Sequence, residues 1–422
     1  MPRPFAVLVL ARCVNRLGGF SMAFLGVHLA TDLGASLALV GVVLAAFGVA
    51  TIPSRLLGGY LAGRVGAVPT MVAGLVGCAV AQLVLAAAPT LGWALVGAVL
   101  LGLAFEVVEP PSQALVADLV DPAGLPSAYA LLWSAIAVAG VAAGGIAALV
   151  VRAGVAWLFV VDAATCLACA LLVAVLLRVP DSTPGGDAGR THGATPTGPT
   201  RFRPLTVAAG DRRLLRHTVV GTVFATAFMV VVFALPLTVG RLGLSASTTG
   251  VLLAVEAAAG LAAQPLVRRV RDQVRADASA LRLGYGVVAL GLAVVALATG
   301  ALEGSGLGFS VVGAIVVLGA GLSVVAVGST LTLGPLQAGA ARLAPAWGRA
   351  AYLAVFGLSW GIASTLAPFV VSTLLPLGAA WPWVAAATLV VALLAVPGRD
   401  ETAPAAPAPS RMTTTTPARA TR

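Results

Sequence analysis

The stretch Leu91-Gly-Trp-Ala-Leu-Val-Gly-Ala-Val-Leu-Leu-Gly-Leu-Ala-Phe105 carries no charged side chain, and the mostly apolar run continues to about residue 117. A helix needs about 20 mostly apolar residues to cross the hydrocarbon core of a bilayer. A strand of a membrane barrel would instead be short and would alternate apolar with polar residues. The run therefore predicts a membrane-spanning helix near 91–117.

The rest of the sequence repeats this pattern. Of the 422 residues, 59% are hydrophobic and 9% are charged, whereas a soluble domain has about 25% charged residues. Backbone polar groups find no partners in lipid, so the apolar runs are expected to be helices. The sequence predicts an all-α membrane protein with twelve transmembrane helices, near 5–31, 37–62, 68–88, 91–117, 126–151, 154–178, 214–240, 246–267, 279–301, 308–333, 346–375 and 379–397.

The runs fall into two groups of six. We expect an N-terminal six-helix bundle at 1–178 and a C-terminal six-helix bundle at 214–397. The segment 179–213 between them is rich in Pro, Gly, Thr and Arg and predicts a flexible cytoplasmic linker. The tail 398–422 is rich in Ala, Pro and Thr and predicts a disordered cytoplasmic segment.

Arginine is unevenly distributed between the two sets of connecting segments. Cytoplasmic loops carry an excess of basic residues. If the N-terminus lies inside, the outer segments hold only Arg152 and Arg241. We therefore expect a multi-pass protein of the cell (plasma or inner) membrane with both termini in the cytoplasm, with the lipid bilayer and not nucleic acid as the partner of its positive charge. The inner segments hold Arg3, Arg64, Arg190, Arg201, Arg203, Arg212, Arg213, Arg268, Arg269, Arg271, Arg275, Arg342, Arg399, Arg411, Arg419 and Arg422.

The two halves of the sequence resemble each other. Gly41-Val-Val-Leu-Ala-Ala46 in the second run corresponds to Gly250-Val-Leu-Leu-Ala-Val255 in the eighth. Val96-Gly-Ala-Val-Leu100 in the fourth run corresponds to Val312-Gly-Ala-Ile-Val316 in the tenth. Parallel repeats of six helices are typical of one class of secondary transporters. The twelve helices are therefore expected to form two six-helix pseudo-repeats.

A loop motif leads to a family. Gly59-Tyr-Leu-Ala-Gly-Arg-Val-Gly66 resembles the G-x-L-x-D-R-x-G motif that follows the second helix of the major facilitator superfamily, with Gly63 in place of Asp. The resemblance implies the major facilitator fold. It also implies that Gly59, Arg64 and Gly66 help to hold the closed cytoplasmic side, although only Arg64 remains to carry charge.

Two further stretches resemble one branch of this superfamily. Gly140-Val-Ala-Ala-Gly-Gly145 is similar to the fifth-helix antiporter motif G-P-x-x-G-G, with Val141 in place of Pro. Trp157-Leu-Phe-Val-Val-Asp-Ala-Ala-Thr165 is similar to the sixth helix of macrolide and siderophore exporters. The resemblance implies a role in gating for Gly140, Gly144 and Gly145, and a packing or gating role for Asp162.

Four charged residues lie inside the first and fourth runs. Arg12 and Arg16 are spaced i,i+4 on one helix face, and Glu106 and Glu109 are spaced i,i+3. At about 1.5 Å per residue, Arg12 and Glu106 lie at a similar depth in the bilayer. Because charge inside a membrane is costly, either Glu106 or Glu109 carries protons beside an arginine, or the charges form a structural ion pair.

The eighth run contains a single carboxyl group near its middle. Glu256 lies about ten residues into this run, and its own half has no Arg at that depth. A carboxyl group in an apolar environment without a basic partner favours its neutral form. We therefore expect Glu256 to be the membrane acid least paired with a base, and a proton or cation site. The alternative is a neutral acid that is hydrogen-bonded to a neighbouring helix.

Several chemistries are not expected. The sequence contains no Lys, and so no G-x-x-x-x-G-K-[ST] nucleotide-binding motif. The pair Cys166-x-x-Cys169 lacks the further Cys or His ligands of a zinc site. We predict no enzyme activity, no catalytic residues, no metal site and no cofactor.

The sequence favours a secondary transporter that works by alternating access. We expect a proton-coupled exporter of small amphipathic or drug-like molecules, because Ala, Val, Leu and Gly dominate the helices. An importer of a small polar nutrient with the same fold is the first alternative. A non-transporting scaffold or receptor is the second, and the charges inside both halves argue against it.

The arginine distribution makes a testable prediction about topology. In intact cells, the variant Gly193→Cys is expected to resist membrane-impermeant thiol reagents, because the segment 179–213 faces the cytoplasm. Ser36→Cys, between the first two runs, should react readily and serves as the control. The parent protein gives the background from the native cysteines. Ready labelling at position 193 would reverse the orientation.

Overall fold

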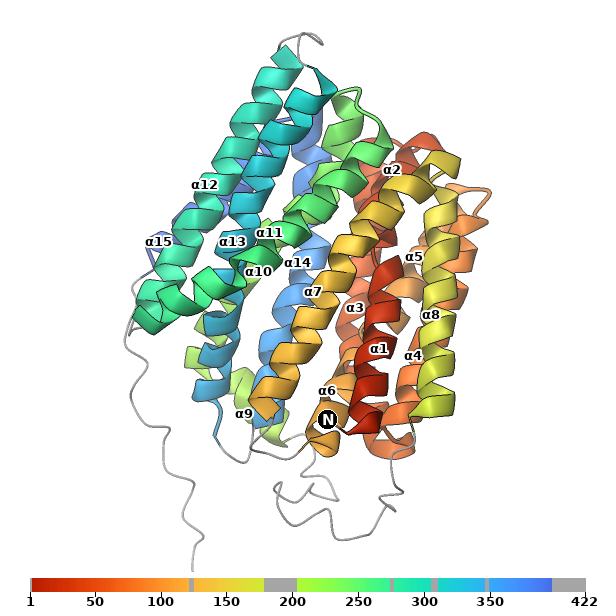
Figure 1. Ribbon diagram of the computed structural model, residues 1–422, viewed down its shortest axis with the longest axis vertical. Coiled ribbons are helices and arrows are strands. Elements are labelled where there is room, and N and C mark those ends of the chain that lie inside the picture. Colours follow the sequence, from red (N-terminus) through yellow and green to blue (C-terminus); the bar gives the residue numbers. More distant parts are fainter. Residues whose placement is uncertain are drawn as a thin grey trace, which may run out of the picture.

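The chain forms a bundle of long helices. The computed structural model describes residues 2–120, 125–177, 203–273, 277–304, 310–345 and 349–396. Across these ranges every regular element is a helix (Figure 1), which confirms the predicted all-α class. The first half contains α1 (Arg3–Gly18), α2 (Ser21–Thr31), α3 (Leu37–Val65), α4 (Ala67–Ala86), α5 (Leu91–Phe105), α6 (Glu109–Leu119), α7 (Leu125–Val150) and α8 (Ala156–Leu176).

The second half follows the same plan. Eleven helical segments of the described chain are long and apolar enough to span a bilayer, and the shorter apolar helix Trp381–Leu394 corresponds to the twelfth predicted run. The prediction of twelve membrane helices is confirmed. The remaining helices are α9 (Arg203–Gly210), α10 (Arg212–Arg241), α11 (Ala246–Gln273), α12 (Asp277–Gly304), α13 (Val311–Leu343), α14 (Arg349–Leu374) and α15 (Trp381–Leu394).

Two of the predicted runs are broken helices. The fourth run divides into α5 and α6, and Pro110 and Pro111 occupy the first turn of α6. Proline lacks an N–H group and clashes with the carbonyl four residues earlier, so it starts a helix more easily than it continues one. The break in this run therefore follows from the chemistry of the two prolines. The first run divides at Gly19 and Phe20 into α1 and α2, a break that the sequence analysis did not predict.

One helix lies in the segment expected to be a linker. Helix α9 occupies 203–210 of the predicted linker 179–213. Its Ala208 is fully buried, and Asp211, which follows it, caps α10 and accepts a 2.9 Å hydrogen bond from Tyr352 Oη of α14. Packing against α14 therefore orders this stretch. The earlier part of the linker and the predicted tail 398–422 lie outside the described residues.

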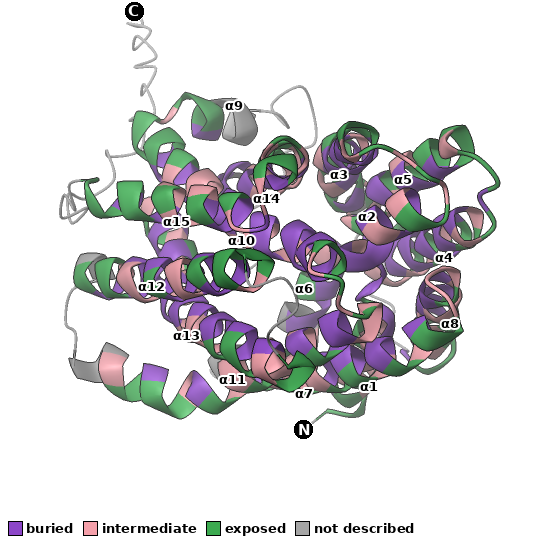
Figure 2. Ribbon diagram, turned by 90° about the horizontal axis from the view of Figure 1, so that it is seen from above, coloured by how far each residue is buried: buried purple, intermediate pink, exposed green. Residues whose placement is uncertain are grey.

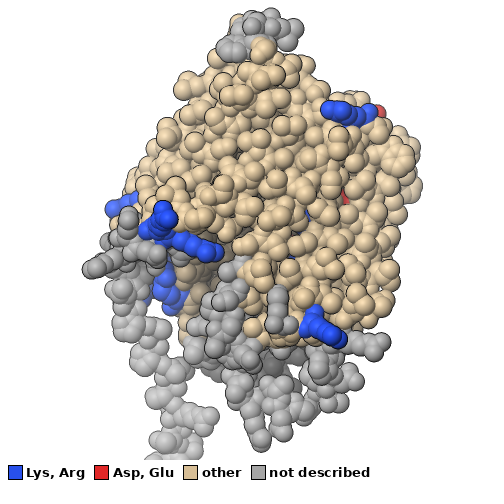
Figure 3. Space-filling view, viewed as in Figure 1, with Lys and Arg blue, Asp and Glu red and all other residues tan. Residues whose placement is uncertain are grey.

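The outside of the bundle is apolar. Large hydrophobic side chains on many helices are exposed, including Leu149, Leu171, Val219, Leu290 and Leu297. Figure 3 shows a broad uncharged surface with Arg side chains mainly toward its edges. Exposed apolar surface on this scale suits lipid and not water.

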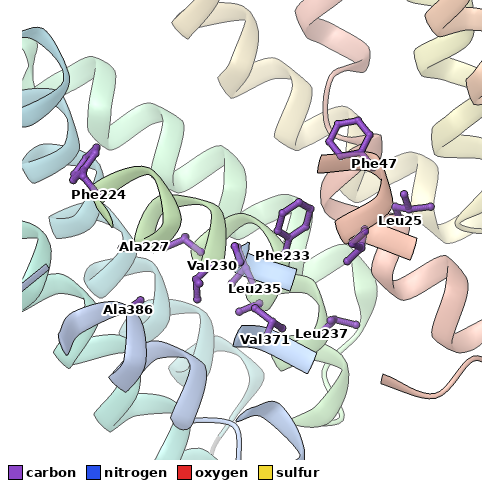
Figure 4. Close-up of a cluster of buried hydrophobic side chains, with 14 of the residues drawn as sticks. Leu25, Phe47, Phe224, Ala227, Val230, Phe233, Leu235, Leu237, Val371 and Ala386 are labelled. Carbon is purple, nitrogen blue, oxygen red and sulfur yellow. The ribbon is translucent and has the colours of Figure 1, made fainter. Parts of the chain in front are cut away.

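The two halves of the chain meet along paired helices. Seen from above, α10, α12, α13 and α15 lie on one side of the bundle and α2, α3, α4, α5 and α8 on the other (Figure 2). Helix α14 packs against α3, and α11 packs against α7, where the sides meet. Buried side chains from both sides share one core, in which Leu25, Phe47, Phe233 and Val371 come from α2, α3, α10 and α14 (Figure 4).

Small residues allow these helices to approach closely. A Cβ atom at Gly144 of α7 would lie 2.5 Å from the backbone nitrogen of Ala254 in α11. A Cβ atom at Gly250 of α11 would lie 2.7 Å from Cα of Ala148 in α7. Small residues are typical of helix contacts in membranes, because little hydrophobic force drives helices together there. The α7–α11 contact is therefore made by backbone against backbone.

The glycines of α7 make a matched pair of variants for testing this contact. Gly144→Ala is expected to destabilise the protein by about 1–3 kcal/mol, because the added methyl group overpacks the interface. Within the described part of the chain, nothing lies within 4 Å of a Cβ atom at the neighbouring Gly145, so Gly145→Ala is expected to be tolerated. Thermal unfolding in detergent measures both effects. Equal midpoints for the two variants would contradict the close contact.

Candidate functional site

The first charged pair of the interior joins α1 to α6. Arg12 Nη2 lies 2.7 Å from Glu109 Oε2, and both side chains are largely buried. Gln113, one turn along α6, donates a 3.0 Å hydrogen bond to the other carboxylate oxygen of Glu109. The sequence placed Arg12 and Glu106 at one depth, but the partner of Arg12 is Glu109. The reason is the break between α5 and α6, which changes the direction in which the acid after it points.

The second charged pair joins the same break to α3. Arg55 Nη1 lies 3.4 Å from Glu106 Oε2. The backbone N–H of Glu106 donates to Ser54 Oγ at 3.1 Å, which satisfies a donor that the end of α5 leaves free. A Cβ atom at Gly58 would lie 2.6 Å from the carbonyl oxygen of Val107. One face of α3 therefore holds the break in place.

Arg55 was missed by the sequence analysis. It lies inside the apolar run 37–62, and a charged residue in such a run is a signal of function. Its guanidinium also donates a 3.4 Å hydrogen bond to the carbonyl of Gly357 in α14, so it contacts both halves of the chain.

A small cavity of about 10 Å³ lies between α3 and α14 and has room for about one water molecule. The residues that line it are Thr51, Ile52, Arg55, Glu106, Gly357, Leu358 and Gly361.

Arg16 of α1 is the third charged group, and it lies near the other half of the chain. It follows Arg12 by one helical turn on the same face of α1. Its charge acts on Glu256 of α11. Among the described residues, Glu106 and Glu109 have ion pairs and Glu256 has none, so Glu256 is less closely paired with a base than either of them. The arginine that acts on it comes from the other half, so counting charges within one half could not reveal it.

A glycine makes room for this approach. A Cβ atom at Gly140 of α7 would lie 3.4 Å from Arg16 Nε and 3.9 Å from Cβ of Ala257, the neighbour of Glu256. The Arg16 side chain is accessible to solvent, and Glu256 is half-buried. Gly140 therefore lies where α1, α7 and α11 meet, at a position that the bundle leaves accessible.

The loop-motif residues lie away from this centre. Gly66 joins α3 to α4 with a φ of 94°, a backbone conformation that favours glycine. Arg64 packs its guanidinium over the ring of Tyr60, 5.0 Å from the ring centre. Nothing lies within 4 Å of a Cβ atom at Gly59.

Asp162 of α8 is buried in a separate polar cluster. It accepts hydrogen bonds from Ser21 of α2 and Gln82 of α4. A Cβ atom at Gly18, where α1 ends, would lie 2.7 Å from Asp162 Cα. In the part of the chain that the structure describes, no three His, Cys, Asp or Glu side chains are grouped as metal ligands.

The family is established by its sequence pattern. Residues 8–335 match the family model of the Major Facilitator Superfamily. The chain belongs to the major facilitator superfamily. It is a multi-pass membrane protein and a secondary transporter, and members of this superfamily are carriers and not enzymes. None of the curated protein sequences compared with the chain matches it.

Solved structures share the fold of this transporter. A POT family transporter in complex with a thioalcohol-conjugated peptide has a TM-score of 0.75 and 13% identity, over 93% of this chain and 95% of that chain. The nucleoside transporter NupG has a TM-score of 0.74 and 12% identity, over 93% and 98%. A POT peptide transporter in complex with sulfate has a TM-score of 0.72 and 16% identity, over 94% of each chain. At such identities the likeness extends to the fold alone.

The pairing of Arg12 with Glu109 can be tested by a double-mutant cycle. Glu109→Gln is expected to destabilise the transporter by roughly 3 kcal/mol, because it leaves Arg12 buried without its partner. Adding Arg12→Gln should restore much of this loss. Glu106→Gln with Arg12→Gln should show no such recovery. Thermal unfolding of the purified variants measures the coupling, and recovery with Glu106 in place of Glu109 would contradict the pairing.

Proposed function

We propose that this member of the superfamily is a proton-coupled transporter in which Glu256 carries the proton. The observation that supports the proposal is the approach of Arg16 to the helix of Glu256 across the two halves, where Gly140 lies between the guanidinium and Ala257. A charged Glu256 attracts Arg16, whereas a protonated Glu256 does not. Protonation therefore weakens one attraction between α1 and α11 and favours their separation. Alternating access requires a change of this kind near the midplane.

The proposal includes two moving bodies. We propose that residues 1–178 and 214–397 move against each other along the α3–α14 and α7–α11 contacts, with both termini in the cytoplasm. Close contacts occur along both pairs, since a Cβ atom at Gly48 of α3 would lie 2.5 Å from the backbone nitrogen of Thr365 in α14. Contacts without long interlocking side chains allow small rotations at low cost. These helix pairs are therefore suitable as the surfaces on which the halves rock.

For the cargo, we propose export of small amphipathic or drug-like molecules. Two observations support this direction. Gly140 and Gly144 belong to a stretch that resembles an antiporter motif, and they lie beside Arg16 and against Ala254 at the boundary between the halves. Proton influx through Glu256 would then drive the outward movement of the cargo. The apolar composition of the helices suits a cargo with apolar parts.

Import of a small polar molecule is the second candidate. The charged pair Arg55–Glu106 lies at the boundary between the halves, where Arg55 contacts Gly357 of α14, and charged side chains suit a polar or zwitterionic cargo. The structural neighbours are described as a peptide-bound POT transporter and a nucleoside transporter. In this case proton and cargo would move in the same direction.

The role of Glu256 can be tested in proteoliposomes. Glu256→Gln is expected to abolish transport driven by a pH gradient, because the amide cannot release or take up a proton. It should retain exchange of cargo across the membrane without a gradient. Glu303→Gln is the matched control, since Glu303 pairs with Arg241 at 2.6 Å near the end of its helix. Normal pH-driven flux in Glu256→Gln would remove this residue from the mechanism.

The same vesicles decide the direction of transport. Lipophilic dyes and antibiotics serve as cargo in one arm, and dipeptides and nucleosides in the other. Export predicts that cargo moves in the direction opposite to the protons, and import predicts that cargo and protons move in the same direction.

Glu106→Gln, which leaves Arg55 unpaired, is expected to lower the stability of the protein more than the coupling of transport to protons. A stable but uncoupled Glu106→Gln variant would assign the proton to Glu106 instead.

A further inference from the structure

A buried polar cluster surrounds Asp162 at the break in the first membrane helix. The clustered residues are Ser21 at the start of α2, Gln82 of α4, and Asp162 and Cys166 of α8. Gln82 Nε2 donates to Asp162 Oδ2 at 2.7 Å and to Ser21 Oγ at 2.8 Å. Ser21 Oγ donates to the same carboxylate oxygen, and Cys166 Sγ donates to the other at 3.6 Å. These hydrogen bonds join α2, α4 and α8, and Gly18 at the end of α1 packs against Asp162.

Among the described residues, no cation lies at ion-pair distance from the carboxyl group of Asp162. The ion pairs found among the described residues join Arg12 to Glu109, His28 to Asp32, Arg55 to Glu106 and Arg241 to Glu303. Asp162 is 5% exposed, and the donors around it are neutral. A buried carboxylate without a counter-charge is expensive in a membrane. If Asp162 is ionised, the cluster therefore lacks a positive charge to balance it.

The charged and titratable groups around Asp162 do not complete it. Arg16 of α1 acts on Asp162 at longer range, but its charge is shared with Glu256. Cys78 of α4 and Cys166 of α8 are the other titratable groups that face Asp162. A thiol near a carboxylate stays neutral and supplies no positive charge.

An unused oxygen lies in the same cluster. Gln82 is 2% exposed, and its Oε1 atom has no hydrogen-bond partner among the described residues. Nε2 of the same amide donates to Ser21 and Asp162, so a rotation of the amide group turns Oε1 toward them. A buried acceptor without a partner costs free energy that a bound ligand can recover. Carboxylate, hydroxyl and amide oxygens together are ligands of hard cations.

We propose that Asp162, Ser21 and Gln82 form a second cation site, separate from Glu256, which binds one proton or one sodium ion. Discontinuous membrane helices are common at the ion sites of transporters, and Ser21 is the first residue of α2 after the break. Helix α2 also contacts α10 of the other half, where a Cβ atom at Gly26 would lie 3.5 Å from Leu237. Occupancy of the site therefore fixes the start of a helix that contacts both halves.

The test is the thermal stability of the purified transporter as ion conditions change. Sodium chloride replaces choline chloride at pH 8.5 in one series, and pH varies from 8.5 to 5.5 without sodium in the other. If sodium binds, the unfolding midpoint of the parent protein is expected to rise by on the order of 2 °C for each tenfold increase of sodium above its Kd. If a proton binds, the midpoint rises as pH falls, and sodium has no effect.

The variants decide whether the response belongs to this site. Asp162→Asn keeps the shape and removes the charge, so it is expected to lose the ion-dependent rise. Ser21→Ala keeps the carboxyl group and removes one oxygen, so it is expected to need a higher ion concentration. Asp32→Asn, whose carboxyl group is partly exposed beside His28, is the control and should respond like the parent.

Two outcomes overturn the proposal. One is a parent protein whose stability does not respond to sodium and responds to pH no differently from Asp162→Asn. The other is an Asp162→Asn variant that keeps the whole response. If Asp162→Asn does not fold, a parent-like ion dependence in Ser21→Ala overturns it equally. The result for Glu256→Gln bears on the proposed coupling role of Glu256 and not on this site.

Discussion

The cost of an unpaired charge in a hydrocarbon layer organises the interior of this transporter. An isolated charge at the bilayer centre costs several kcal/mol, so each interior arginine lies near an acid on another helix. Arg12 joins α1 to α6, and Arg55 joins α3 to the end of α5. Arg16 interacts with Glu256 of the other half. These electrostatic pairs restrict which helices can be neighbours and at what rotation, whereas apolar packing alone would tolerate several arrangements.

Length and hydropathy predicted most of the architecture, because each is a local property of the chain. The twelve runs needed no knowledge of tertiary contacts, and the break at Pro110 and Pro111 agrees with the chemistry of these two residues. The break at Gly19 and Phe20 was missed because two apolar helices separated by two residues have the sequence pattern of one long run. Two consecutive glycines, Gly18 and Gly19, were the available signal.

The partners within the site could not be predicted in the same way. Counting residues gives the depth of Arg12 and Glu106, but not the direction of a side chain after a break. Glu106 is the residue that follows α5, so helical spacing does not relate its direction to that of Glu109. Arg16 and Glu256 are separated by more than half of the chain, and only the packing of α7 on α11 brings them near each other.

The glycines of one sequence motif have separate physical roles. Gly140 leaves space for the guanidinium of Arg16, and Gly144 lets the α11 backbone touch α7. Gly145 faces open space, so neither reason applies to it. A motif therefore indicates a region of the fold, and geometry is needed to say which of its residues the region depends on.

The break in the first membrane helix connects Glu256 and Asp162, for which no ion pair is found among the described residues. Arg16, just before the break, is directed toward Glu256, and Ser21, just after it, donates to Asp162. Gly18 packs against the backbone of Asp162, so the end of α1 cannot move far without disturbing the cluster. A rotation of α1 that releases Arg16 from Glu256 would therefore act on the cluster through Gly18, two residues further along the chain, and Ser21, five residues further along. The two acids differ in what surrounds them, since Glu256 faces the other half of the protein and Asp162 faces only its own. If both bind cations, the broken helix is the shortest mechanical route by which one site can respond to the other.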